Sequence, residues 1–223
     1  MMKHIQTEPA GQTPLTPARP EHPVPARRQT DGMHWYIAVV THNTEKACAR
    51  RLAEWQTCRQ HFSPVELQTY VPVQRELHVW PSNGKKRWID RIICPSFLFV
   101  RCTEAVRYAI KAENPFILHF LKDRATRRDG SPVIPFAVIS DAQMTAFRQM
   151  VGDAESPVTI DARRLKVGSP VRIKTGRLAG LTGYLYRPPR KKSTSFCIQI
   201  NMLGYARMEI DAAMLEEITE AEI

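Results

Sequence analysis

The residue types that commonly perform catalysis or hold metals are present in this chain, but their spacing forms no reactive cluster. The seven histidines lie at positions 4, 22, 34, 42, 61, 78 and 119, and none is paired with another histidine or a cysteine at metal-ligand spacing. The five cysteines form no Cys-x-x-Cys pair, and no nucleophile-elbow, zinc-protease or phosphate-loop motif occurs. The sequence therefore predicts a protein that is not an enzyme and that holds no metal and no cofactor.

One cysteine has neighbours that could make a thiol reactive. Cys48 lies close to Lys46 and Arg50, and nearby cations favour the nucleophilic thiolate. The same residue is also the first of three apolar residues, with Leu52 and Trp55, that are spaced for one face of a helix. A small core residue is the favoured interpretation of Cys48, and a reactive thiol is the alternative.

Cations and tryptophans alternate in one segment, which makes it the strongest candidate for binding. Cations can hold phosphates, and exposed aromatic rings can stack on bases. The candidate nucleic-acid-binding residues of this segment are Arg75, Lys85, Lys86, Arg87, Trp88 and Arg91. The alternative is a solubilising tip whose tryptophans pack inward.

The charge of the chain also indicates a polyanionic partner. Lys and Arg total 32 against 22 Asp and Glu, so the formal charge is +10. Eleven basic residues and no acidic one lie between Arg163 and Arg207, whereas six acidic residues and no basic one follow from Glu209 onward. Such a basic block attracts nucleic acid, because each neutralised phosphate releases a counterion. The alternative is a solvated face that the acidic end of the same domain balances.

Composition restricts the class of protein. Apolar residues make up 43% of the chain, which is enough for a packed core. No apolar run reaches the length of about eighteen residues that a membrane-spanning helix needs. Residues 1–32 lack the apolar stretch of a secretory signal. We therefore expect a soluble, cytoplasmic protein with reduced thiols and no membrane contact.

The elements that would position these residues can be predicted from cap and turn residues. Residues 33–152 predict the order strand, helix, strand, hairpin, strand, helix, strand, helix, which is close to the split β-α-β ferredoxin-like pattern. Asn83-Gly84 between two strand-like runs indicates the hairpin, because both residues tolerate a positive φ. Thr103 and Ser140 are placed to cap the second and third helices.

Composition divides the chain into four parts. Residues 1–32 are rich in proline and poor in large apolar residues, so we expect a flexible tail. Residues 33–152 form the α/β domain and residues 153–164 a polar linker. Residues 165–220 carry four short strand-like runs between glycines, which predicts a small β-barrel that ends in a helix over 212–218.

Several segments resemble known modules. Residues 167–185 look like a KOW motif, and residues 202–210 resemble the last hairpin of that module. Three upstream segments resemble the NusG family of transcription elongation factors: Trp35-Tyr36-Ile37, Thr69-Tyr70-Val71-Pro72 and Cys94-Pro95-Ser96-Phe97-Leu98-Phe99-Val100. The resemblance spans residues 34–218. It implies an α+β fold with a ferredoxin-like NGN domain followed by a small SH3-like β-barrel, the KOW domain.

The resemblance also implies a function. Members of the family bind the clamp helices of RNA polymerase and suppress pausing and termination, so the chain would be a monomeric bacterial antitermination factor. The basic hairpin resembles that of specialised paralogues, with the UpxY-type antiterminators of capsular polysaccharide operons as the nearest group. In such proteins the hairpin would reach the upstream DNA duplex or the displaced non-template strand.

The resemblance implies two sets of protein-binding residues. The positions that match the polymerase-binding pocket of the family are Val39, Ile93, Cys94, Phe97 and Phe99. Cys94 stands where the family often has a large aromatic residue, and Ser96 replaces a usual Gly or Asn. Either the pocket would be shallower or the side chain of the partner would be larger. The loop that would meet a ribosomal protein or the termination factor Rho consists of Met202, Leu203, Gly204 and Tyr205. For both sets the alternative is ordinary core packing.

A second function remains open at this point. A ribosome-associated or RNA-binding KOW protein would also explain the basic block between Arg163 and Arg207.

Overall fold

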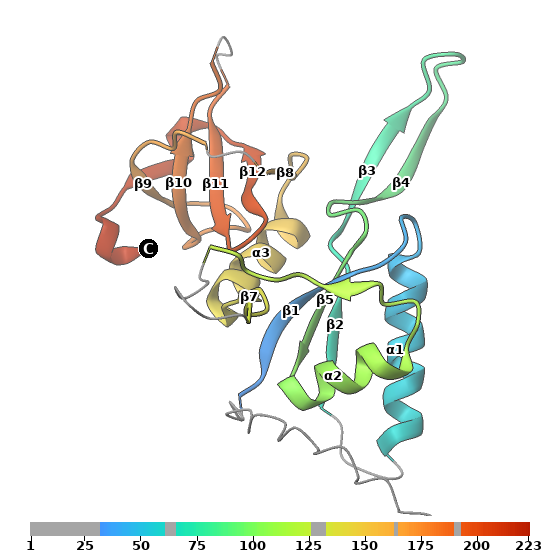
Figure 1. Cartoon of the computed structure of the whole chain (residues 1–223). Helices are drawn as coiled ribbons and strands as arrows, with labels where there is room; N and C mark the ends of the chain where they lie inside the picture. Colours follow the sequence, from blue (N-terminus) through green and yellow to red (C-terminus); the bar gives the residue numbers. More distant parts are fainter. Residues whose placement is uncertain (1–31, 61–65, 126–132, 163–164, 190–192) are drawn as a thin grey trace, which may run out of the picture.

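Two β-sheets, a long hairpin and three α-helices make up the described part of the chain (Figure 1). The computed structural model describes residues 32–60, 66–125, 133–162, 165–189 and 193–223. The predicted N-terminal tail, residues 1–32, therefore lies outside the described residues except for Gly32. The predicted mixture of helices and strands is confirmed.

The first sheet is antiparallel and is centred on two apolar strands. β1 (His34–Val39) and β5 (Phe97–Cys102) pair along their whole length. β2 (Gln68–Tyr70) pairs with β5, while β6 (His119–Phe120) and β7 (Val138–Ile139) pair with β1. The central strands consist mainly of β-branched, aromatic and other apolar residues, which suits a sheet that is covered on both faces.

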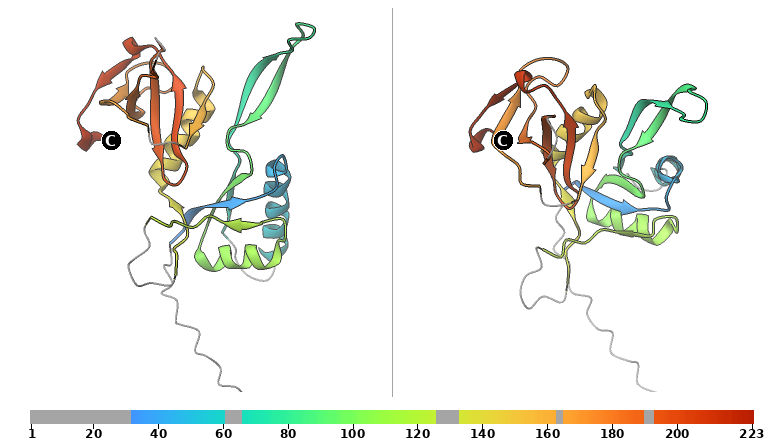
Figure 2. Two further views of the ribbon diagram at one scale, coloured as in Figure 1. Left: turned by 45° about the horizontal axis from the view of Figure 1, so that its top comes forward. Right: turned by 90° about the horizontal axis from the view of Figure 1, so that it is seen from above.

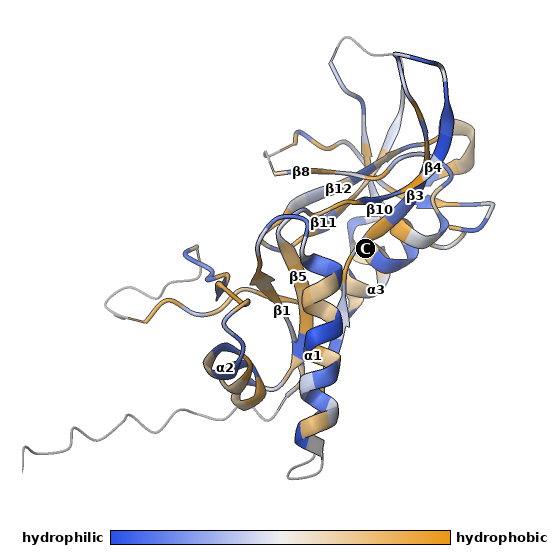
Figure 3. Ribbon diagram, turned by 90° about the vertical axis from the view of Figure 1, so that its right-hand side faces the viewer, coloured by the Kyte–Doolittle hydropathy of each residue, from blue (hydrophilic) through white to orange (hydrophobic). Residues whose placement is uncertain are grey.

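Helices α1 (Glu45–Gln60) and α2 (Glu104–Glu113) cover one face of this sheet. Side chains alternate along a strand, so Tyr36 and Ala38 of β1 point toward these two helices. Cys48 is buried in the same cluster, which confirms that it is a core residue. The charged residues Lys46, Arg50, Arg51 and Glu54 of α1 are exposed, and Figure 3 shows hydrophilic and apolar bands alternating along this helix.

Helix α3 (Asp141–Asp153) covers the opposite face and lies between the two sheets (Figures 1 and 2). Its buried residues Met144, Phe147 and Met150 belong to one apolar cluster with residues of both sheets. The first and second halves of the chain therefore share a core.

Local capping chemistry explains where two of the helices begin. The Thr103 hydroxyl accepts a hydrogen bond from the Val106 backbone N–H at 3.3 Å, and the Ser140 hydroxyl accepts one from Gln143 at 3.2 Å. Both predicted caps are confirmed.

The predicted hairpin is also confirmed and consists of β3 (Val73–Val79) and β4 (Lys86–Ile92). Gly84 has a φ of 65°, and the Asn83 side chain accepts a hydrogen bond from the Lys85 N–H at 3.0 Å. In both views of Figure 2 the hairpin projects away from the two sheets.

The second sheet is antiparallel, and its strands lie in the order β13-β9-β10-β11-β12-β8. No ladder joins the edge strands β13 and β8 within the described residues, so a closed barrel is not confirmed. The six strands are β8 (Thr159–Asp161), β9 (Pro170–Ile173), β10 (Thr182–Tyr186), β11 (Ser195–Ile200), β12 (Gly204–Glu209) and β13 (Leu215–Glu217).

The helix predicted over residues 212–218 is wrong. Only a short 3₁₀ turn, η1 (Ala212–Met214), forms there, and β13 follows it directly. The Asp211 side chain caps this turn, and Leu215 then pairs with Ile173. Pairing with the free edge of β9 therefore overrides the local helix preference. A second 3₁₀ turn, η2 (Glu220–Glu222), lies at the end of the chain.

The segment predicted as a linker contains ordered structure. Residues 159–161 form β8, which pairs with β12. The preceding residues 154–158 are bonded to the base of the hairpin, because Gln74 and Arg91 both contact their backbone. Hydrogen bonds to its backbone and pairing with β12 thus tie this segment to neighbouring elements.

Candidate interaction surfaces

The five residues predicted to bind polymerase lie around one end of the β1–β5 pair, but they differ in exposure. Val39 and Phe97 are directly opposite each other in the ladder, and both are partly exposed. Ile93, Cys94 and Phe99 are buried. Burial raises the pKa of the Cys94 thiol to about 12, so this side chain is a neutral thiol.

Core packing accounts for the burial of Phe99. Its ring lies 6.0 Å from the ring of Phe147 in α3 and 6.2 Å from that of Tyr70. These aromatic contacts fill the space above the middle of β5. The surface that remains open to a partner is therefore narrower than the predicted pocket and is centred on Val39 and Phe97.

A buried carboxylate holds the turn that presents Phe97. The Glu45 side chain is fully buried, and its Oε1 accepts hydrogen bonds from the backbone N–H groups of Ser96 at 2.6 Å and Asn43 at 3.2 Å. Ser96 and Asn43 have φ values of 66° and 63°, a region that L-residues seldom adopt. Glu45 thus stabilises two strained turns at once, and no local sequence pattern indicates this role.

One face of the hairpin is apolar, aromatic and basic. The register places Leu77 opposite Trp88 and Val79 opposite Lys86. Trp88 is 56% exposed and Leu77 is 46% exposed. The Arg75 guanidinium lies 5.5 Å from the centre of the Trp88 ring, within cation–π distance. The alternative in which the tryptophans pack inward is therefore wrong for Trp88.

The other face of the hairpin binds the protein itself. Arg91 donates to the Glu76 carboxylate at 2.7 Å and to the Val158 backbone oxygen at 2.8 Å. The Gln74 side chain accepts a hydrogen bond from the Val158 N–H at 2.8 Å. Arg91, one of the predicted nucleic-acid-binding residues, is thus engaged in holding the segment that follows α3.

The tip of the hairpin carries the remaining predicted cations. Lys85, Lys86 and Arg87 are all exposed there. Figure 3 shows the outer part of β4 in the colour of hydrophilic residues. Trp80 lies on the opposite face from Trp88 and packs edge-on against His78, with ring centres 4.5 Å apart. The free cations and Trp88 therefore gather toward the outer half of the hairpin.

The predicted partner loop of the second sheet is mostly packed. Leu203 is buried, and Tyr205 pairs with Asp161 of β8. A side chain at Gly204 would place its Cβ 2.3 Å from the Asp161 backbone oxygen, so glycine is required at this close approach. Met202 is the exposed apolar residue of the loop.

The described residues contain no group of three or more metal-ligating side chains that could hold an ion. All five cysteines are free, and burial raises the pKa of Cys102 and Cys197 to about 12. Among the described helices none is both long and apolar enough to cross a membrane.

Comparison with known proteins gives one family match. A family model described as transcription termination factor NusG matches residues 33–148, which is more than half of the chain. No curated protein matches the chain significantly.

Two of the solved structures that match the chain are the following. One, described as domain interaction in Thermotoga maritima NusG, is 15% identical, with 84% of this chain and 98% of that chain covered and a TM-score of 0.47. The other, the MjSpt4:Spt5 complex, is 11% identical, with 83% of this chain and 98% of that chain covered and a TM-score of 0.25. The family domain includes the Phe97 turn, the Glu45 carboxylate and the hairpin, and on that match the chain belongs to the NusG family of transcription factors.

Proposed function

We propose that this protein is a transcription elongation factor that binds the clamp helices of RNA polymerase and suppresses pausing and termination. The observation that carries the proposal is the family domain over residues 33–148. Within it, Val39 and Phe97 form a partly exposed apolar pair beside a rigid turn. An aromatic anchor on a rigid support is typical of residues that dominate a protein interface.

Transcription in vitro tests this function. RNA polymerase is followed on a template with a pause site and a terminator, with and without the full-length protein. We expect shorter pauses and more read-through with the protein, and a loss of that effect in Phe97→Ala. Val133→Ala, which truncates an exposed apolar residue elsewhere, is the matched control. Unchanged pausing and termination with the wild-type protein would contradict the proposal.

We further propose that the outer half of the hairpin binds DNA next to the polymerase. Trp88 and Leu77 offer an apolar surface with Arg75 and Lys86 on the same face, while Lys85 adds positive charge at the tip and Arg87 on the opposite face. A stacked base contributes about 1–3 kcal/mol, whereas the cations hold the backbone. Such a surface fits unstacked bases of the displaced non-template strand better than a closed duplex.

Fluorescence anisotropy with labelled single-stranded and duplex DNA tests the role of the hairpin. Trp88→Ala should weaken single-strand binding by about fivefold or more, because one stacking contact is lost. Trp80→Ala removes the same residue type from the opposite face and should change affinity less. Equal losses in the two variants would contradict binding by the Trp88 face.

We also propose a narrower class for this protein within the NusG family. The basic hairpin supports a specialised paralogue of UpxY type that acts on particular operons, such as those for capsular polysaccharides. Deleting the gene should then lower transcript levels at the distal end of one operon and leave most others unchanged. A uniform change across the genome would instead indicate a general elongation factor.

An RNA-binding role for the C-terminal part has weaker support. Arg172 donates to Glu216 and Glu222 at 3.3 and 2.8 Å, so the acidic end of the chain balances part of the basic block. Arg177 lies 3.5 Å from Asp153. Five other basic residues of the block, at positions 163, 164, 190, 191 and 192, lie outside the described residues.

A further inference from the structure

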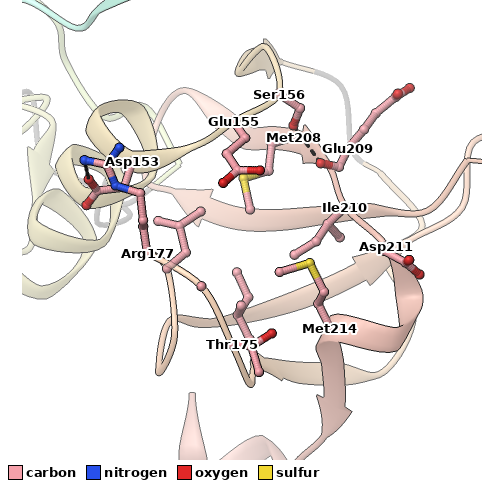
Figure 4. Close-up of a pocket in the computed structure, with 13 residues that line it drawn as sticks. Asp153, Glu155, Ser156, Thr175, Arg177, Met208, Glu209, Ile210, Asp211 and Met214 are labelled. Atoms are coloured by element: carbon pink, nitrogen blue, oxygen red, sulfur yellow. Dashed lines mark hydrogen bonds and ion pairs between the residues drawn. The ribbon is translucent and has the colours of Figure 1, made fainter.

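A cavity of about 280 Å³ lies apart from the Phe97 turn, the hairpin and the loop over residues 202–205 (Figure 4). It is bounded by the end of α3, the segment that follows α3, and strands of the second sheet. Sites for small-molecule ligands usually occupy about 300–1,000 Å³. The volume of this cavity therefore suits one long side chain better than a complete metabolite.

The wall of the cavity is apolar and adaptable. Ile173, Leu178 and Met208 are buried behind it, whereas Ile210 and Met214 are partly exposed at its mouth. Figure 4 shows the two methionines and Ile210 gathered around the same space. Methionine side chains are flexible and polarisable, so they can pack against the stem of an inserted residue.

The rim of the cavity is acidic although the chain as a whole is basic. Its lining contains four carboxylates and a single cation, Arg177. In Figure 4 Arg177 reaches Asp153 at the edge, and the two groups are 3.5 Å apart. The exposed Glu155 makes no hydrogen bond or ion pair with any described residue. One carboxylate at the rim thus already holds a guanidinium, and a second is open to another cation.

Two contacts hold the sides of the cavity together. The Ser156 hydroxyl donates to the Glu209 backbone oxygen at 2.6 Å, and Arg177 joins Asp153 from the other side. Because the chain forms these contacts without a partner, a ligand would enter a largely preformed site. Preformed sites lose less conformational entropy on binding.

We propose that this cavity binds a lysine or arginine side chain from a basic segment of a partner protein. The apolar stem of such a side chain would lie against Leu178, Met208 and Met214, and its charged end would meet Glu155. Long cationic side chains commonly bury their stems on apolar surface while the charge stays near water. The inference rests on the cavity alone and does not depend on the proposed function.

Methionine methyl NMR of the full-length protein can test the proposal. The chain is labelled on its eight methionines, and Met214→Leu assigns the key signal. The probe is the peptide acetyl-Gly-Leu-Arg-Leu-Gly-amide, compared with the same peptide carrying glutamine or glutamate in place of arginine. We expect the arginine peptide to shift the Met208 and Met214 signals and the other two peptides to bind at least about fivefold more weakly, as lost ion pairing implies.

Two variants and a control make the test specific. Glu155→Lys should weaken the binding of the arginine peptide by about fivefold. Glu217→Lys makes the same charge change on β13 and should leave the binding of this peptide unaltered. Thr175→Trp, at the mouth, should block binding. Absence of a shift at millimolar arginine peptide, equal binding of the glutamate peptide, or full binding by Thr175→Trp would each overturn the proposal.

Discussion

At the scale of single residues, burial separates side chains that are close neighbours in the sequence. Phe97 and Phe99 both lie on the α3 side of β5. Phe99 is enclosed by Tyr70 and Phe147, whereas Phe97 sits at the end of the strand beside Val39 and stays partly exposed. The two rings should therefore have different roles. Phe99 should stabilise the fold, and Phe97 should bind a partner.

Alanine substitution should separate these two roles. Phe99→Ala should lower the free energy of unfolding by about 3–5 kcal/mol, because it leaves a cavity in the core. Phe97→Ala should change unfolding much less and weaken binding to the polymerase clamp helices by about 2 kcal/mol. Chemical denaturation and a binding titration measure the two quantities. A Phe97→Ala protein that is folded and binds the clamp helices as tightly as wild type would remove Phe97 from the interface.

A second prediction at this scale concerns acid. Hydrogen bonds from the Thr219 backbone and from Arg172 lower the pKa of Glu222 from 4.5 to about 2. Because this pKa is lowered on folding, the contact stabilises the C-terminal turn above about pH 4.5 and is lost as the pH falls toward 2. An NMR titration of the Glu222 carboxyl carbon measures the midpoint. Arg172→Gln should move that midpoint upward, and an unchanged midpoint would contradict the assigned cause.

At the scale of elements, the hairpin has one face that is free apart from the ion pair between Asp90 and Lys46 of α1, and one face that is bound. Gln74 and Arg91, at the base, hold the backbone of residues 154–158, whereas Leu77 and Trp88 point to solvent. The segment after α3 then continues into β8 of the second sheet. The hairpin is therefore connected to the second sheet through a few side-chain bonds to a neighbouring backbone.

Removing one of these bonds should loosen the segment without unfolding the hairpin. In Gln74→Ala the Val158 N–H loses its acceptor, so its hydrogen exchange should become faster by about tenfold, which corresponds to about 1.4 kcal/mol. Exchange mass spectrometry or NMR measures the rate. Leu77→Ala, on the free face of the same strand, should leave it unchanged. A similar acceleration in both variants would indicate general loosening of the hairpin.

At the scale of the whole molecule, α3 joins the two sheets into one apolar cluster. Its buried residues contact β1 and β5 on one side, and residues of the second sheet belong to the same cluster. A further bond runs from the Asn201 side chain to the Val138 backbone oxygen at 2.8 Å. A core that is shared in this way should make the two halves unfold together.

Probes in the two halves can test this cooperativity. All four tryptophans lie in the first half, at positions 35, 55, 80 and 88, while Met208 and Met214 report on the second sheet. Tryptophan fluorescence and methionine methyl NMR should give the same unfolding midpoint. Phe147→Ala, in α3, should lower both midpoints equally. Two separate midpoints would show that the halves are independent.

Much of the local structure follows from short stretches of sequence. Asn83-Gly84 identified the hairpin, and Thr103 and Ser140 identified the starts of two helices, because these residues satisfy backbone groups within a few positions of themselves. The family resemblance rested on similarly short segments, and the family match over residues 33–148 bears it out. Chemistry that acts over a few residues can be recognised before the fold is known.

The sequence alone determined the basic hairpin, the starts of two helices and the family, whereas the tertiary structure decided which side chains remain available. Local pattern does not distinguish Phe97 from Phe99, nor the bonded Arg91 from the free Lys86. The edge of β9 likewise converted a predicted helix into β13. Exposure and pairing depend on elements that are distant in the chain, so only their packing against one another fixes which residues can meet a partner.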